Sequence, residues 1–73
     1  MDGTAEVELL RCNYAARCRA PRCRQYRATT IVRYLEERGH LLRQFEACDE
    51  HAGLIVRREQ LRGMTVRDIR GSS

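Results

Sequence analysis

Cysteine and histidine are the residue types of this 73-residue chain with the most distinctive chemistry, and five of the six lie in two clusters. The clusters consist of Cys12, Cys18 and Cys23, followed by Cys48 and His51. Thiolate sulfur and imidazole nitrogen are preferred zinc ligands, and a set of four at tetrahedral corners makes a closed structural site. The two clusters together therefore predict a single structural zinc ion.

The second cluster has a spacing with a structural reason. Residues i and i+3 project from the same side of a helix, so Cys48 and His51 can share one ion. Asp49 and Glu50 suit a helix N-terminus, which also stabilises a thiolate. We expect a helix to begin here, with an apolar stripe and a stop at Gly63. The expected stripe consists of Ala52, Ile55, Val56 and Leu61.

The first cluster offers more cysteines than the site needs. The spacers on either side of Cys18 hold five and four residues, both near the usual range of two to four. We choose Cys12 and Cys18 as ligands, with Cys23 as the alternative to Cys12. If it is not a ligand, Cys23 would be a small buried hydrophobe. The remaining histidine, His40, is expected in a solvated turn.

Residues 26–47 are compatible with two structures. In the first, a hairpin pairs a strand ending near residue 35 with a return strand over 41–47, and Gly39 takes positive φ in the turn. In the second, residues 29–39 form a helix capped by Thr29 or Thr30. We favour the hairpin, because the run 29–32 is rich in β-branched residues and a hairpin returns Cys48 towards Cys18. Residues 64–69 would add a short strand or an extended segment.

A cysteine loop, a hairpin and then a helix carrying the second ligand pair resembles a treble-clef zinc finger. A second resemblance, carried further by residues 32–51 and covering about residues 12–58, is to small, mostly uncharacterised zinc-finger-like proteins of actinobacteria and their phages. The resemblance implies a small α+β metal-stabilised domain. It matches the positions Cys12, Cys18, Pro21, Gly39, Cys48 and His51. The first spacer is one residue longer than that pattern, and Cys23 is additional.

The organisation expected from composition is one domain. We expect a flexible N-terminus over residues 1–8, a single zinc-binding domain over 9–69 and a disordered tail over 70–73. Residues 7–10 are a candidate short strand that leads into Cys12. No run of about 18 apolar residues is present, so we expect no membrane partner. The acidic residues near the start do not suit a secretory signal, so we expect a cytoplasmic protein with reduced thiols.

All 14 basic residues are arginine, and no acid lies between Leu9 and Leu35. Because guanidinium groups suit phosphate and carboxylate, this stretch is a candidate anion-binding surface, although a solvated surface is the simpler interpretation. The candidate nucleic-acid or partner-binding residues are Arg17, Arg19, Arg22, Arg24, Arg27, Tyr14 and Tyr26, extended by Arg57 and Arg58 of the helix.

The expected function is a zinc-stabilised binding module that engages nucleic acid or a nucleoprotein machine through these arginines. An enzyme is not expected, nor is a small-molecule substrate, because a closed site leaves no open metal position. One alternative is a protein–protein interaction adaptor that binds an acidic patch. Another is an iron–sulfur or thiol redox sensor. The sensor would use Cys12, Cys18, Cys23 and Cys48.

Overall fold

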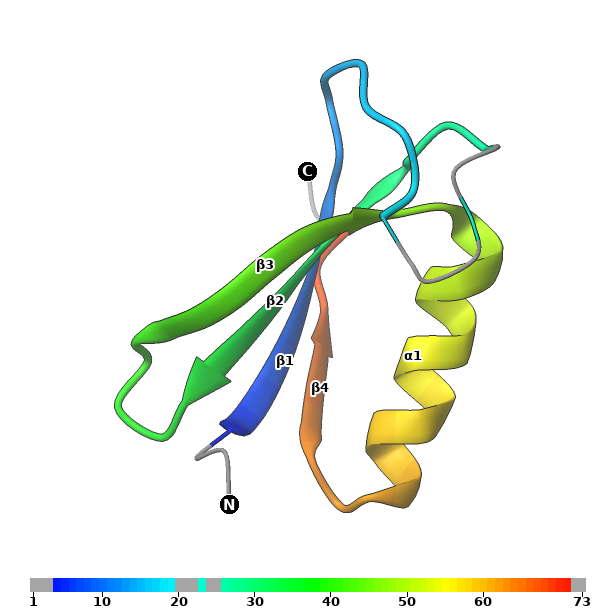
Figure 1. Cartoon of the computed structure of the whole chain (residues 1–73). Helices are drawn as coiled ribbons and strands as arrows, with labels where there is room; N and C mark the ends of the chain where they lie inside the picture. The colour runs from blue at the N-terminus through cyan, green and yellow to red at the C-terminus, as the bar shows by residue number, and fades with distance from the viewer. Residues whose placement is uncertain (1–3, 20–22, 24–25, 72–73) are drawn as a thin grey trace.

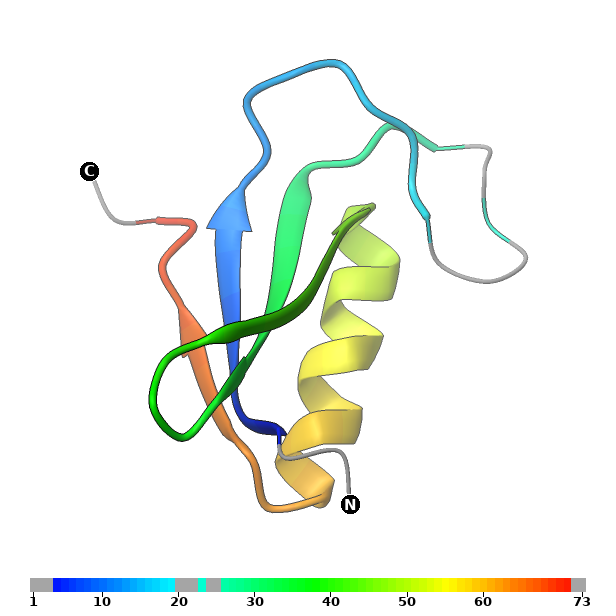
Figure 2. The ribbon, with the colours of Figure 1, turned by 60° about the vertical axis from the view of Figure 1, so that its left-hand side comes forward.

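The computed structural model describes residues 4–19, 23 and 26–71, which form a small α+β fold with one sheet and one helix. The sheet has the strand order β3-β2-β1-β4, and helix α1 lies along one of its faces (Figures 1 and 2). The elements in chain order are β1 (Thr4–Arg11), β2 (Thr30–Glu36), β3 (Leu41–Ala47), α1 (Asp49–Leu61) and β4 (Thr65–Asp68).

Strand β1 is an inner strand, antiparallel to β2 and parallel to β4. It includes residues 4–8, which the sequence analysis had assigned to a flexible N-terminus. Val7 and Leu9 are fully buried, so this strand supplies two of the central core side chains. Glu8, the one residue between them, lies on the other face and forms ion pairs with Arg33 and Arg67. Burial on one face and ion pairing on the other together explain why this acidic segment joins the sheet.

The hairpin is confirmed, and the helix alternative for residues 29–39 is wrong. Strands β2 and β3 are antiparallel, and the turn between them contains Gly39 at φ 86°. Val32 pairs with Phe45 in the register that brings Ala47 back beside Thr30. The return places the end of β3 at the same end of the sheet as the loop that follows β1 (Figure 1).

Helix α1 begins directly after Cys48 and is followed by Gly63 at φ 82°, as expected. Its buried stripe differs at the end from the prediction, because Leu61 is 83% exposed whereas Glu59 is buried. The physical reason is helical spacing, since Glu59 lies four residues beyond Ile55, on the same face. The Glu59 carboxylate is compensated by an ion pair of 3.3 Å with Arg58.

The C-terminal segment is tied to the sheet. Met64 leads into β4, and the main-chain nitrogen of Ile69 donates a hydrogen bond of 2.9 Å to Leu9. Arg70, which we had expected in a disordered tail, pairs with Asp68 at 2.6 Å and lowers the pKa of that carboxyl to about 2. Among the described residues, no helix is long and apolar enough to cross a membrane.

Candidate metal centre

Four potential metal ligands meet where the loop after β1 reaches the start of α1. They are Cys18, Cys23, Cys48 and His51, and their ligand atoms all lie within 4.8 Å of one another. The three cysteines are almost completely buried, and His51 is half-buried. This Cys3His group is able to hold a metal ion, since soft ligands converge there in a space largely closed to water.

The distances within the group suit tetrahedral coordination. Around tetrahedral zinc, a sulfur and a nitrogen ligand are separated by about 3.6 Å, as follows from bond lengths of about 2.3 and 2.0–2.1 Å. Nδ1 of His51 lies 3.1 Å from Sγ of Cys48 and 3.8 Å from Sγ of Cys18. The two observed distances bracket the reference value, so only small side-chain movements are needed to close the site on an ion.

The helix start positions the second ligand pair. Cys48 is the N-cap residue with extended backbone angles, and its carbonyl accepts the first helical hydrogen bond, from Ala52 at 2.9 Å. His51 follows in the first turn, on the same side. The hydroxyl of Thr29, just before β2, donates a hydrogen bond to the Asp49 carboxylate. This contact fixes the helix start against the loop that carries the other ligands.

The loop between β1 and β2 positions the first ligand pair by folding back on itself. The main-chain nitrogen of Cys18 donates to the carbonyl of Tyr26 at 2.9 Å, beside a bridge between Arg17 and Arg27. The nitrogen of Arg19 donates to the carbonyl of Glu46 in β3 at 2.8 Å. The loop is therefore attached to the end of the hairpin, next to the residue that precedes the helix.

The structure does not bring Cys12 to the group, although we had chosen it as a ligand, and Cys23, named as the alternative, is present instead. Cys12 directly follows β1, and its main-chain nitrogen donates to Thr29 at 2.9 Å, which extends the β1–β2 pairing. Its thiol points to the carbonyl of Tyr14 at 3.4 Å. Cys12 thus stays on the line of the sheet, before the chain turns over towards α1.

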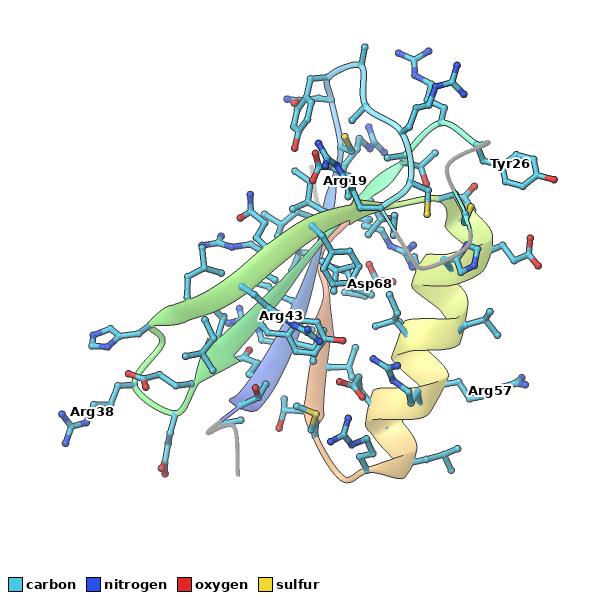
Figure 3. The ribbon with its side chains drawn as sticks, in the orientation of Figure 1. Arg19, Tyr26, Arg38, Arg43, Arg57 and Asp68 are labelled. Atoms are coloured by element: carbon cyan, nitrogen blue, oxygen red, sulfur yellow. The ribbon has the colours of Figure 1, made fainter. Side chains whose placement is uncertain are left out.

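The predicted nucleic-acid or partner-binding residues are dispersed. Tyr14 and Tyr26 are both exposed, but they lie at separate places on the loop, and Tyr26 points outward in Figure 3. Arg57 extends from α1 away from the sheet (Figure 3). Arg22 and Arg24 lie outside the described residues. The predicted set is completed by Arg17 and Arg27, which face each other in the loop bridge, and by Arg19 and Arg58.

Arg19 and Arg58 come together at a groove of about 580 Å³ between β3 and α1. Arg43 and Phe45, the β3 residues of this groove, were not among the predicted site residues. The alternation of the return strand placed them on one face with Ala47, but it did not indicate that this face meets α1. The groove is also lined by Leu54 and Ile55, and by the metal-site residue His51.

Two of the groove arginines are held by Tyr34 of β2. The guanidinium of Arg43 lies over the Tyr34 ring, 4.4 Å from its centre. The Tyr34 hydroxyl accepts a hydrogen bond of 3.3 Å from Arg58, and this bond raises the pKa of Arg58. Tyr34 and Phe45 stack with ring centres 6.2 Å apart. The groove therefore combines apolar lining residues with arginines, two of which contact Tyr34.

Comparison with protein-family models, with curated proteins and with solved structures gives no match to this chain.

Proposed function

We propose that this protein is a small binding module stabilised by one structural zinc ion. The observation that carries the proposal is the Cys3His group at the start of α1. Zinc is favoured over other metals because three thiolates and one imidazole match its structural sites. The treble-clef resemblance agrees with this arrangement, since a hairpin here joins a cysteine loop to a helix that carries the second ligand pair.

The chemistry of the group supports a structural and not a catalytic metal. Four protein ligands complete a tetrahedron and leave no position for water or a substrate. The iron–sulfur alternative loses support for a related reason. It required Cys12 as a ligand, and Cys12 lies outside the group, whose fourth member is His51.

For the partner, the geometry favours an adaptor that binds another protein. The groove between β3 and α1 is lined by apolar residues and by arginines, which suits an acidic protein surface. The zinc ion would act indirectly, by fixing the loop and the helix that form part of this groove. Arg19 comes from that loop, and Leu54 and Arg58 come from the helix.

Metal analysis of the purified protein tests the structural part of the proposal. One zinc ion per chain is expected, together with loss of helical circular dichroism when a strong chelator removes it. A folded, metal-free protein would contradict the proposal. The partner is tested by affinity capture from nuclease-treated lysate, with His51→Ala as the unfolded control. An interaction that nuclease removes would instead indicate nucleic acid.

Nucleic acid remains the second candidate because of one observation at the loop. Arg17 and Arg27 form a cross-strand pair, close to the exposed Tyr26, so two cations and one stacking surface share this region. Binding of labelled single-stranded RNA or DNA with a strong salt dependence is the expected result for this candidate. Absence of binding at about 50 mM salt would eliminate it.

A further inference from the structure

Strand β3 is an edge of the sheet, and no described strand pairs with its outer side. The carbonyl of Glu46 points to that side, because it accepts from Arg19 of the loop, whereas the carbonyl of Ala47 accepts from Thr29. Main-chain directions alternate along a strand, so the N–H and C=O of Gln44 also point outward. An edge of this kind is a template for pairing with another extended chain.

The groove lies under the same edge. Arg43 and Phe45 project from β3 to the face on which α1 lies, and Figure 3 shows Arg43 extending in that direction. Leu54 on the helix side is 54% exposed, so an apolar surface is available opposite the strand. The groove volume of about 580 Å³ is within the range of ligand sites, about 300–1,000 Å³.

We propose, on the basis of the adaptor function above, that β3 and α1 bind an extended acidic peptide segment of a partner protein. The segment pairs its main chain with the outer edge of β3. Alternate side chains then point under the sheet, and an apolar one enters the groove beside Phe45 and Leu54. Carboxylates two residues before and two residues after it point to the same face and meet the guanidinium groups of Arg43 and Arg58.

Charge complementarity selects this occupant. The groove is lined by three arginines, and no acidic residue is among its lining residues. Two of these guanidinium groups are held in place before binding, Arg43 over Tyr34 and Arg58 at the Tyr34 hydroxyl. Binding to held groups costs less side-chain entropy, which favours recognition of carboxylates at defined positions.

Two other occupants are disfavoured by the same residues. Nucleobases need an open aromatic face, but Tyr34 is only 2% exposed and Arg43 already covers one side of its ring. A second copy of the chain would pair β3 with β3 and bring the arginines of both copies close together. Like charges placed opposite each other destabilise a sheet.

Peptide selection with a phage-displayed library of random linear peptides tests the proposal on the zinc-loaded full chain. The expected consensus has Leu, Ile or Phe at one position and Asp or Glu two residues before and two residues after it, so that all three side chains share one face. A synthetic consensus peptide is then measured by fluorescence anisotropy. Leu54→Glu and Arg43→Glu are each expected to weaken its binding about tenfold or more. Every second N–H of the peptide would bond to β3, and the others would point away. N-methylation of the first set of amides is therefore expected to abolish binding, and N-methylation of the second set is not.

The matched controls make the same chemical changes away from the groove. Arg38→Glu in the hairpin turn and Leu61→Glu near the helix end are expected to change binding less than twofold. Equal weakening by Arg38→Glu and Arg43→Glu would overturn the proposal, because it would show only general charge attraction. A consensus without acids, or binding insensitive to N-methylation of both sets of amides, would also overturn it.

Two further measurements separate the competing occupants and the two proposals. If sedimentation shows a dimer, and Leu54→Glu removes it, the groove would be assigned to a second copy of the chain and the peptide proposal would be overturned. Single-stranded RNA or DNA that competes for the groove more tightly than the consensus peptide would do the same. A folded chain with one zinc that selects no peptide would overturn only this inference. Absence of zinc would overturn the proposed function itself.

Discussion

Sγ of Cys48 and Nδ1 of His51 lie 3.1 Å apart across the first turn of α1. The N-cap position and the third residue after it bring both atoms to one side, so the helix start itself prepares half of the metal site. The other half comes from a loop that must fold back before it can contribute. A metal ion held by all four ligands would therefore join a locally encoded pair to a distant one, and its binding would be coupled to folding.

The first prediction concerns the helix ligands. His51→Ala and Cys48→Ala are each expected to remove metal binding and to unfold much of the domain. Structural zinc contributes about 10–16 kcal/mol in small domains, whereas a core of this size supplies only about 3–5 kcal/mol. Metal content by mass spectrometry and helical circular dichroism are the measurements. Either variant retaining one tightly bound metal and the wild-type spectrum would show that the site is not structural.

The second prediction separates the two candidate ligands of the loop. Cys23→Ser is expected to reduce metal affinity strongly, because Cys23 belongs to the converging group. Cys12→Ser is the matched control and is expected to keep one metal per chain, because the Cys12 thiol lies at the Tyr14 carbonyl and outside the converging group. Titration against a chromogenic chelator gives both affinities. Retention of metal in Cys23→Ser with loss in Cys12→Ser would restore the ligand set first chosen from the sequence.

The hairpin and the helix ligands were predictable because their signals are local. β-branched residues in β2, a glycine turn at Gly39 and acids after Cys48 each specify their own stretch of chain. The candidate metal ligands as a group followed from residue type and clustering along the chain. The choice between Cys12 and Cys23 as a ligand could not be predicted, because the spacing of cysteines does not say in which direction the chain runs after β1. Cys12 continues the β1–β2 pairing, whereas the chain beyond Arg17 turns towards α1.

The length of strand β1 was underestimated for a similar reason. Residues 1–5 show no periodic pattern, so the sequence predicted a mobile end and only a short candidate strand over residues 7–10. Their place in the sheet depends on partners far along the chain, such as Arg33 and Arg67 for Glu8. The groove was missed because Arg43 and Arg58 meet only after α1 packs under β3. Such contacts between distant elements are set by tertiary structure and leave little trace in a local pattern.

The third prediction uses the same substitution at two glycines. Gly53→Ala is expected to raise the free energy of unfolding by up to about 1 kcal/mol, because alanine favours a helix and the added Cβ has no atom within 4 Å. Gly39→Ala is expected to lower it by about 1–2 kcal/mol, since Gly39 has φ 86° in the turn. Chemical denaturation of the zinc-loaded protein measures both. The same sign for the two variants would contradict the assigned helix or the assigned turn.

The fourth prediction concerns the pair of Asp68 and Arg70. Arg70 lowers the pKa of the Asp68 carboxyl to about 2, so the pair stabilises the fold above the unfolded pKa of about 4. The stabilisation is lost as the pH falls from about 4 through about 2. Because Asp68 is half exposed, Asp68→Asn is expected to cost no more than about 1 kcal/mol at pH 7.

A double-mutant cycle with Arg70→Gln isolates the contribution of this pair, because Arg70 also donates a hydrogen bond of 3.2 Å to Thr30. The coupling free energy is expected to be favourable at low ionic strength and to shrink in about 1 M salt, where the screening length is about 3 Å. It is expected to persist from pH 7 down to about 5, since the carboxyl stays ionised over that range. A coupling of zero at low salt would mean that Arg70 is held by Thr30 alone. The depressed pKa of Asp68 would then contribute nothing to stability.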